Sequence, residues 1–303
     1  MTLALHSIRL PFHLELNHVW VHLAACDGGY LMIDAGFGNE ASMEALAAGL
    51  REAGVAWKDI HTLILTHAHP DHMGLVTQIQ ELSGARLWMH ARDVEFLKRI
   101  TSERGEENLL RWGTPAALAD RVVEASKSTG KYFRVLTPDR LIEDGDRVGP
   151  FTAVWTPGHA PGHLCYFEPG SRTLIAGDHV LPEITPHVSW SEGEDALADF
   201  LRSLERVAAM DVAVVVPSHG EVFRDLPGRV AEITEHHRLR CNAVMEALAS
   251  GARTPHDIVG RLWRQTLSPF QYRFGIYEVM AHLEYLERNG TLSAGSSYSS
   301  MGG

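Results

Sequence analysis

The chain has 303 residues and a mass of 33.5 kDa, which allows one large domain or a catalytic domain with a smaller appendage. Hydrophobic residues make up 45% and charged residues 21%, so a sizeable core is available and disordered, collagen-like and coiled-coil chains are excluded. The net charge of −11 argues against a protein whose main task is to bind the phosphate backbone of nucleic acids.

Short apolar runs alternate with helical segments over the first two-thirds of the chain. Residues 31–33 predict a buried strand, and a helix is expected from about Glu40 to Ala53 because Leu46 and Leu50 recur at helical spacing. Strands buried on both faces and alternating with helices indicate a layered α/β domain. Further strands, most of them followed by a Pro, Gly or Asp turn signal, are expected at 63–65, 85–89, 152–155, 174–176 and 212–216.

The pattern changes between about Arg92 and Lys131. This stretch is charged and helical in its spacing, and glycines interrupt it. We interpret it as a helical insertion that covers a site as a lid. Its apolar members are Phe96, Leu109, Leu110 and Trp112.

Helices alone are predicted from Arg229 onward, at about 229–249, from Thr254-Pro255, and at about 270–289. Thr254 as the N-cap with Pro255 in the first helical position is a strong start signal. The tail from Ser293 is rich in Ser and Gly and is expected to fray. These patterns predict a catalytic domain at 1–228, a helical domain at 229–292 and a flexible tail at 293–303.

The cysteines and the chain's hydrophobic profile predict a cytoplasmic protein with no membrane segment. Cys26, Cys165 and Cys241 lie far apart in sequence without a CxxC pair, which does not make a disulfide framework and fits a reducing compartment. The first residues lack a signal-peptide pattern, and no apolar run approaches the length of a membrane helix. The 18 histidines are the unusual feature, and they direct attention to metal binding.

Residues 66–72, with the sequence THAHPDH, directly follow the apolar strand at 63–65. Side chains two apart in an extended segment point the same way, so His67 and His69 can bind one ion together. Pro70 ends the strand, and the turn that follows presents Asp71 and His72 in another direction, toward a second ion. Imidazole and carboxylate suit divalent ions such as zinc. The alternative, a histidine-rich loop without function, is a poor match to four ligand-type residues in six positions.

Three later loops repeat this arrangement of a polar residue just past an apolar strand. His159 and His163 lie in the run TPGHAPGH at 156–163, Asp178 lies in GDH at 177–179, and His219 lies in PSHG at 217–220. Open α/β sheets place ligands outside the ends of their strands, so these loops are expected to converge on one crevice.

The runs HxHxDH, TPGHxPGH, AGD and PSHG, in this order and spacing, resemble the metallo-β-lactamase fold superfamily over roughly residues 8–225. The resemblance implies a four-layer αββα sandwich with a dinuclear metal site at one edge. It implies that Asp178 bridges two ions, and that His163 supports the site or packs beside it. It further implies that His67, His69 and His159 bind the first ion, and Asp71, His72 and His219 the second.

The run DAGFG at 34–38 resembles the early D-x-G loop of that family, in which Asp34 would support a ligand. The same stretch matches GxGxxA between a strand and a helix, a dinucleotide-binding pattern. That alternative requires an acidic residue at the end of the next strand, and this strand is followed by His67.

The resemblance implies two divalent ions, most often zinc with iron or manganese as alternatives, and a hydroxide held between them that attacks the carbonyl of an ester, thioester or lactone. Asp178 would hold the bridge, and Asp71 would orient the nucleophile. PSHG at 217–220 departs from the run typical of glutathione thioesterases, and Leu181 stands where related lactonases carry tyrosine. A phosphodiesterase or nuclease, and a mononuclear-iron persulfide dioxygenase, remain the alternatives.

The segment from Gly251 to Gly290 resembles the winged-helix-like tail of some hydrolases of this fold. Residues 229–303 carry eight basic and seven acidic residues, a poor footprint for nucleic acid. We therefore expect a small-molecule substrate and a structural or dimerising role for the tail. His18, Trp20 and His22 are expected either to edge the pocket or to face solvent, and His236 and His237 to be solvated. Further candidates for the pocket or its packing are His179, His187, Trp190, Tyr272 and Phe274.

Overall fold

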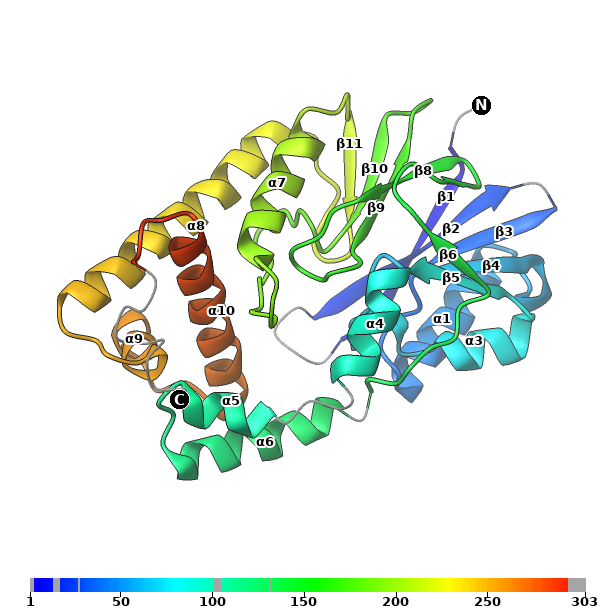
Figure 1. The fold of residues 1–303 in the computed structure, drawn as a ribbon. Helices are drawn as coiled ribbons and strands as arrows, with labels where there is room; N and C mark the ends of the chain where they lie inside the picture. Colours follow the sequence, from blue (N-terminus) through cyan, green and yellow to red (C-terminus); the bar gives the residue numbers. More distant parts are fainter. Residues whose placement is uncertain (1–2, 13–16, 27, 101–104, 131, 294–303) are drawn as a thin grey trace.

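The computed structural model describes residues 3–12, 17–26, 28–100, 105–130 and 132–293. Two β-sheets lie face to face, and helices cover both outer faces (Figure 1). This is the four-layer αββα sandwich that the sequence motifs implied. The predicted tail lies outside the described residues beyond Ser293.

The first sheet has six strands in the order β1-β2-β3-β4-β5-β6. Neighbours from β1 to β3 are antiparallel, and those from β3 to β6 are parallel. The parallel strands all end at one edge, which is where the first histidine motif begins. The strands are β1 (Leu5–Pro11), β2 (His18–Cys26), β3 (Gly29–Ile33), β4 (Ile60–Ile64), β5 (Arg86–His90) and β6 (Arg140–Ile142).

The second sheet has five strands in the order β11-β10-β9-β8-β7. Its pairs are antiparallel except that β10 and β11 run parallel. β10 and β11 therefore end at the same edge and deliver the Asp178 and His219 loops together. The strands are β7 (Arg147–Val148), β8 (Phe151–Trp155), β9 (Leu164–Glu168), β10 (Thr173–Gly177) and β11 (Val214–Pro217).

Central strands are apolar on both faces because each face meets another layer. In β3, Leu31 and Ile33 enter the core between the sheets, whereas Met32 faces the helices outside the first sheet. In β10, Ile175 faces the core between the sheets and Leu174 faces the outer helices. Side chains of a strand alternate between its two faces, and in these strands one face packs between the sheets while the other packs on the outer helices. Residues on both faces are therefore apolar, which explains the continuous apolar runs in the sequence.

The C-terminal helices lie close to their predicted ranges, whereas α7 (Ala196–Ala208), before them in the chain, was not among the predicted helices. Thr254 caps the short helix there, accepting from the backbone of Asp257. Within the described residues no helix combines the length and apolar character that a bilayer span requires. The helices are α1 (Glu40–Glu52), η1 (Trp57–Asp59), α2 (Pro70–Met73), α3 (Val76–Ser83), α4 (Ala91–Ile100), α5 (Gly105–Arg111), α6 (Ala116–Gly130), α7 (Ala196–Ala208), α8 (Leu226–Ala249), α9 (Pro255–Leu262) and α10 (Pro269–Arg288).

The described residues of the predicted helical insertion form three helices, and two of these pack on the C-terminal helices. α5 and α6 lie against α10 and α9 (Figure 1), where Thr114 Oγ1 lies 2.8 Å from the hydroxyl of Tyr272. The backbone N–H of His256 donates to the carbonyl of Trp112 at 3.1 Å. Tyr272 is therefore a core residue and does not line the pocket. This part of the insertion braces the helical region.

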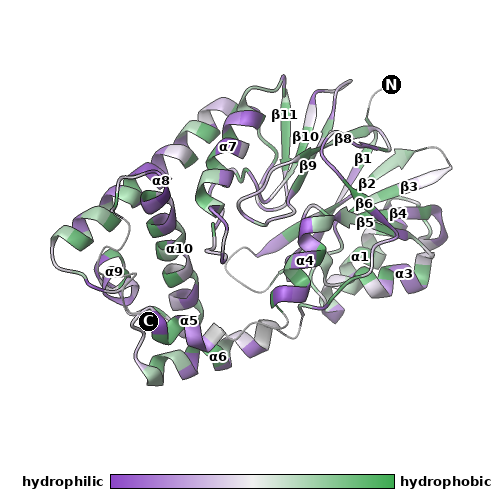
Figure 2. Cartoon of the chain, in the orientation of Figure 1, coloured by the Kyte–Doolittle hydropathy of each residue, from purple (hydrophilic) through white to green (hydrophobic). Residues whose placement is uncertain are grey.

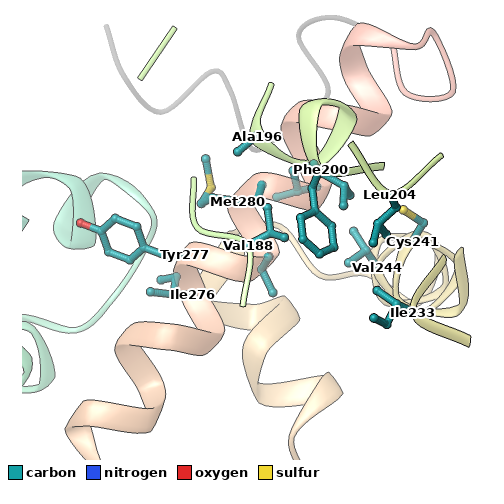
Figure 3. Close-up of a cluster of buried hydrophobic side chains, with 14 of the residues drawn as sticks. Val188, Ala196, Phe200, Leu204, Ile233, Cys241, Val244, Ile276, Tyr277 and Met280 are labelled. Atoms are coloured by element: carbon teal, nitrogen blue, oxygen red, sulfur yellow. The ribbon is translucent and has the colours of Figure 1, made fainter. Parts of the chain in front are cut away.

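One buried apolar cluster joins the second sheet to α7, α8 and α10. Phe200 of α7 lies next to Leu204, Cys241 and Val244, and Ile276 of α10 belongs to the same cluster (Figure 3). Figure 2 shows β9 to β11 apolar along their length, while α8 and α10 alternate apolar and polar residues. The C-terminal helices thus share a core with the αββα sandwich.

His237 of α8 contradicts the expectation of a solvated histidine pair. Its ring is buried, and its Nδ1 atom lies 3.1 Å from Nε2 of His282 on α10. Burial lowers the pKa of His237 to about 2, so the ring is neutral. The sequence pattern missed this because the face of α8 that carries His237 packs on α10.

Two of the three cysteines are expected to be inert in the native protein. Burial raises the pKa of Cys165 to about 12 and that of Cys241 to about 11, so neither forms a reactive thiolate at neutral pH. Cys26 is half buried. Titration with a thiol-reactive disulfide should therefore detect at most one fast thiol in the native chain and three after denaturation. Fast reaction of three thiols in the folded protein would contradict this packing.

Candidate metal centre

The seven predicted ligands meet where strands of both sheets end. β4 leads to His67 and His69, and the short helix α2, with Pro70 in its first position, carries Asp71 and His72. The remaining three residues follow β8, β10 and β11 and are His159, Asp178 and His219. The side chains form two groups, each with ligand atoms within 4.8 Å of one another.

The first group consists of three imidazoles whose nitrogens converge. Nε2 of His67 lies 2.9 Å from Nδ1 of His69 and 3.2 Å from Nε2 of His159. Burial lowers the pKa of all three rings, that of His69 to about 3, so they are neutral. His159 donates from Nδ1 to the carbonyl of His187 at 2.8 Å, which leaves its Nε2 as a lone pair aimed at the group.

His67 is held in the same tautomer. The hydroxyl of Thr66 donates to Asp34 at 2.8 Å, so the Nδ1 atom of His67, 3.0 Å away, donates to that hydroxyl. The Nε2 lone pairs of His67 and His159 therefore face each other without a proton between them. A cation between these nitrogens satisfies both, and neutral imidazole is a ligand that zinc prefers.

The second group combines two carboxylates with two imidazoles. Nε2 of His72 lies 3.6 Å from Asp71 and 3.5 Å from Asp178, and Nε2 of His219 lies 3.3 Å and 3.4 Å from the same carboxylates. Burial opposes charge on His219, yet Asp178 and Asp71 raise its pKa to about 10. Burial also opposes ionisation of Asp178, but His219 and His72 lower its pKa well below the usual value. The raised pKa of His219 and the lowered pKa of Asp178 thus have one cause, the attraction between the imidazoles and the carboxylates of this group.

Three buried atoms of this group have no hydrogen-bond partner among the described residues: His72 Nε2, Asp178 Oδ1 and His219 Nε2. Buried polar atoms almost always have a hydrogen-bond partner. Three such atoms that lack one and lie close together are therefore consistent with a site that binds a cation. Asp178 also faces the first group, because its Oδ2 atom lies 3.7 Å from Nε2 of His159. Its two oxygens are thus directed at different groups.

Each ligand ring of the second group is fixed by a hydrogen bond on its far nitrogen. Nδ1 of His72 donates to Asp34 at 2.8 Å, and Nδ1 of His219 donates to the carbonyl of His18 at 2.6 Å. Such bonds set the tautomer and the ring orientation in metal sites. Asp34 thus has the supporting position expected from its motif. Thr66 and the carbonyls of His18 and His187 were not predicted as partners of the ligands. Every residue has a backbone carbonyl, so the sequence does not indicate which carbonyls accept a hydrogen bond from a ligand.

His163 lies beside the centre and outside both groups, as expected. It accepts from the backbone N–H of Asp178 at Nε2, 3.1 Å away, and donates from Nδ1 to Thr156 at 2.8 Å. Gly177 permits this contact, because its φ is +53° and a Cβ there would lie 2.6 Å from His163 Nε2. His163 therefore positions the backbone of Asp178.

Several other candidates are buried packing residues. His18 and His22 lie inside the fold, where Arg9 and Ser7 contact them at 3.2 Å and 2.9 Å, so neither edges the pocket nor faces solvent. Trp20 donates to the carbonyl of Gly220, which ties β2 to the His219 loop. His179 is fully buried against Phe200 and does not line the pocket.

A cavity of about 840 Å³ opens beside both groups, within the range of small-molecule sites. His69, Asp71, His159 and Asp178 form its floor. α4 borders it, so this helix is the part of the insertion that covers the site. Of the candidates that the sequence leaves open between the pocket and packing, His187, Trp190 and Phe274 line it. Aromatic residues from both sequence halves, Phe12, Phe37, Phe96, Phe133, Trp263 and Phe270, also contribute to the wall.

Two family models match the chain. Residues 16–219 match the metallo-beta-lactamase superfamily, and residues 241–298 match the metallo-beta-lactamase-like C-terminal domain. A metallo-beta-lactamase family protein of Thermus thermophilus, TTHA1429, is similar in structure, with a TM-score of 0.83, 30% identity and 97% of each chain covered. A beta-lactamase domain protein of Burkholderia ambifaria gives a TM-score of 0.83 at 28% identity, covering 94% of this chain and 87% of that one.

Two curated relatives cover different shares of their own length. The probable metallo-hydrolase YqjP of Bacillus subtilis is 24% identical, over 95% of this chain and 93% of that protein. The lactamase-like protein adaB of Aspergillus niger is 28% identical over 78% of this chain, but the match spans only 61% of adaB. The chain thus covers less than two-thirds of that relative.

Proposed function

The chain belongs to the metallo-beta-lactamase superfamily and has the fold and clustered site of a metallo-hydrolase, and from this premise we propose that it is a dinuclear enzyme that hydrolyses an ester, thioester or lactone. The observation that carries the proposal is Asp178, whose two carboxylate oxygens are directed at two separate groups of ligand-type side chains. A mononuclear centre needs only one of those groups.

The seven residues would hold two divalent ions, for which we propose zinc. Neutral imidazoles and ionised carboxylates suit zinc, and iron and manganese accept the same donors. His67, His69 and His159 would bind the first ion, Asp71, His72 and His219 the second, and Asp178 both.

The ions, when bound, would lower the pKa of water toward neutrality and polarise the carbonyl of the substrate. The chain's own residues do the positioning. Asp71 lies in the cavity floor with its pKa lowered, since its histidine neighbours outweigh the effect of burial. Its carboxylate can therefore accept a hydrogen bond from the attacking water and orient it. The wall around it is largely apolar and limits the access of other water molecules.

A panel of substrates tests this function through one readout, the release of acid. The panel contains a thioester, lactones, aryl esters and a phosphodiester, each with and without chelator. We expect chelator-sensitive acid release from one carbonyl class. If the metal-loaded protein is silent on every carbonyl substrate, the proposal is wrong. Turnover of the phosphodiester alone would favour a nuclease, and oxygen uptake with one iron per chain would favour the dioxygenase.

Replacing Asp34 with asparagine is expected to weaken metal binding by about 10- to 100-fold, because the partner that orients a ligand is altered. Asp34 accepts from the backbone and hydroxyl of Thr66 and from His72. Asparagine offers an amide N–H to one of these three donors, so His72 loses its fixed orientation. Metal retained after dialysis against graded chelator measures the effect. Asp120→Asn, on the exposed face of α6, is the control and should bind metal like the native chain.

A further inference from the structure

Most charged side chains in the cavity wall are paired with an opposite charge. Arg92 donates to Glu194 at 2.8 Å, and the guanidinium of Arg99 lies 3.9 Å from the same carboxylate. On α10, Glu278 lies 2.9 Å from Arg240. Arg92 and Arg99 share the single carboxylate of Glu194, and Arg99 also donates to the hydroxyl of Ser191, so both guanidinium groups already have partners.

Two further acidic residues of the wall are also accounted for. Asp199 of α7 accepts from Arg202 on the same helix, and Glu192 is exposed, so its carboxylate is hydrated. Among the charged wall residues that the structure describes, the guanidinium without a hydrogen bond or an ion pair is that of Arg273, near the start of α10.

Arg273 is half buried, and its guanidinium lies over the ring of Tyr277, 4.9 Å from the ring centre. Within the described part of the chain it has no hydrogen bond and no ion pair. The aromatic face holds the group in place but leaves its N–H donors available, because a cation–π contact uses none of them. A pre-positioned guanidinium in an apolar wall is a site for an anion.

Phe274, the next residue after Arg273, connects this part of α10 to the candidate metal centre. Phe274 packs on the ring of His187, with ring centres 4.8 Å apart, and the carbonyl of His187 accepts from the ligand His159 at 2.8 Å. A molecule that reaches the carbonyl-binding floor of the cavity can therefore extend to Arg273 at its wall.

We propose that Arg273 determines substrate specificity by binding a carboxylate of the substrate at a distance from the bond that is cleaved. The inference rests on the proposed hydrolase function and adds a substrate class, an acyl compound with a bulky apolar or aromatic body and a separate carboxylate. The body matches the aromatic wall, which includes Phe96, Phe133 and Phe270. A carboxylate matches a single guanidinium, whose N–H donors can bind both of its oxygens in parallel.

The test uses equilibrium binding, so it does not depend on turnover. The probes are 6-(naphth-2-yl)hexanoate and its primary amide, which differ only in charge, and naphthalene fluorescence reports binding to the metal-loaded protein. We compare the native chain with Arg273→Gln, Arg273→Lys and Arg264→Gln. Arg264 is exposed and outside the cavity wall, so its replacement makes the same change in net charge nearby.

The native chain should bind the carboxylate about 10- to 100-fold more tightly than the amide, as expected for a charge-assisted hydrogen bond. Arg273→Gln should reduce this preference to about twofold or less, Arg273→Lys should retain part of it, and Arg264→Gln should retain all of it. No preference in the native chain would overturn the inference. A preference that survives in Arg273→Gln would also overturn it, because the ions or another cation would then hold the carboxylate.

Hydrolysis separates this inference from the proposed function. Two thioesters that differ only in a terminal carboxylate or carboxamide are compared in the same variants. If both are cleaved equally, the hydrolase proposal stands and Arg273 has no role in specificity. If neither these thioesters nor any carbonyl substrate of the panel is cleaved while the binding preference depends on Arg273, the anion site stands and the hydrolase proposal is wrong.

Discussion

Asp178→Ala is expected to lower kcat/KM for chelator-sensitive hydrolysis by about 10³-fold or more, because a metal ion supplies several kcal/mol of transition-state stabilisation. The substitution removes the carboxylate that faces His72, His219 and His159 together. We also expect the purified variant to lose at least one metal equivalent per chain. Acid-release kinetics and elemental analysis of the same preparation measure both effects.

Asp211→Ala is the matched control for this variant. Asp211 is an exposed aspartate that pairs with Arg172 far from the cavity wall, so its loss should leave metal content and turnover unchanged. Circular dichroism of both variants checks that the fold is retained. An Asp178→Ala protein with full metal content and native turnover would contradict the assignment of Asp178 as the shared ligand.

Phe200→Ala is expected to lower the free energy of unfolding by about 3–5 kcal/mol, the usual loss when a fully buried phenylalanine is removed. Phe200 is 0% exposed and packs against residues of α7, α8 and α10 (Figure 3). At this chain length the loss corresponds to a decrease in Tm of roughly 5–8 °C. Calorimetry or chemical denaturation measures the change.

Leu239→Ala is the control that tests whether burial of the side chain causes the loss of stability expected for Phe200→Ala. Leu239 lies on α8 with 53% of its surface exposed, so its truncation should change stability by no more than about 0.5 kcal/mol. A similar small effect from Phe200→Ala would contradict the shared core. Separate melting of the C-terminal helices in the native chain would contradict it as well, because Phe200 joins them to the sandwich.

The central strands could be predicted because each is buried on two faces. β3, β10, β11 and the end of β4 give short apolar runs, as expected for strands that are covered on both faces. β1 and β6 carry polar and exposed residues and give no such run. α7 is absent from the predicted helices, although Leu197, Phe200, Leu204 and Val207 recur at helical spacing in the sequence.

The site was more predictable than its surroundings. All seven residues proposed as ligands converge, since each lies within a few residues of the end of a central strand and such ends share one edge of the sandwich. The residues that line the cavity were harder to foresee. Phe12 and Phe274 meet at the same cavity only through the tertiary packing of the first sheet and α10, which no local pattern records.

Two histidines show why the surroundings of a side chain are hard to predict. For His179 the sequence allows either the pocket or packing; it follows Asp178 directly, and its side chain packs in the core against Phe200. His237 lies among charged neighbours on α8, but its face of the helix is covered by α10. Local composition indicates that a histidine is present, whereas its function depends on which face of the element is buried.

The most direct test of the account is anomalous X-ray scattering from crystals of the metal-loaded protein, collected above and below the absorption edge of the bound metal. We predict two peaks in each chain. One should lie among His67, His69 and His159, the other among Asp71, His72 and His219, with Asp178 in contact with both. A single peak, or metal bound only outside these groups, would contradict the dinuclear centre on which the proposed chemistry depends.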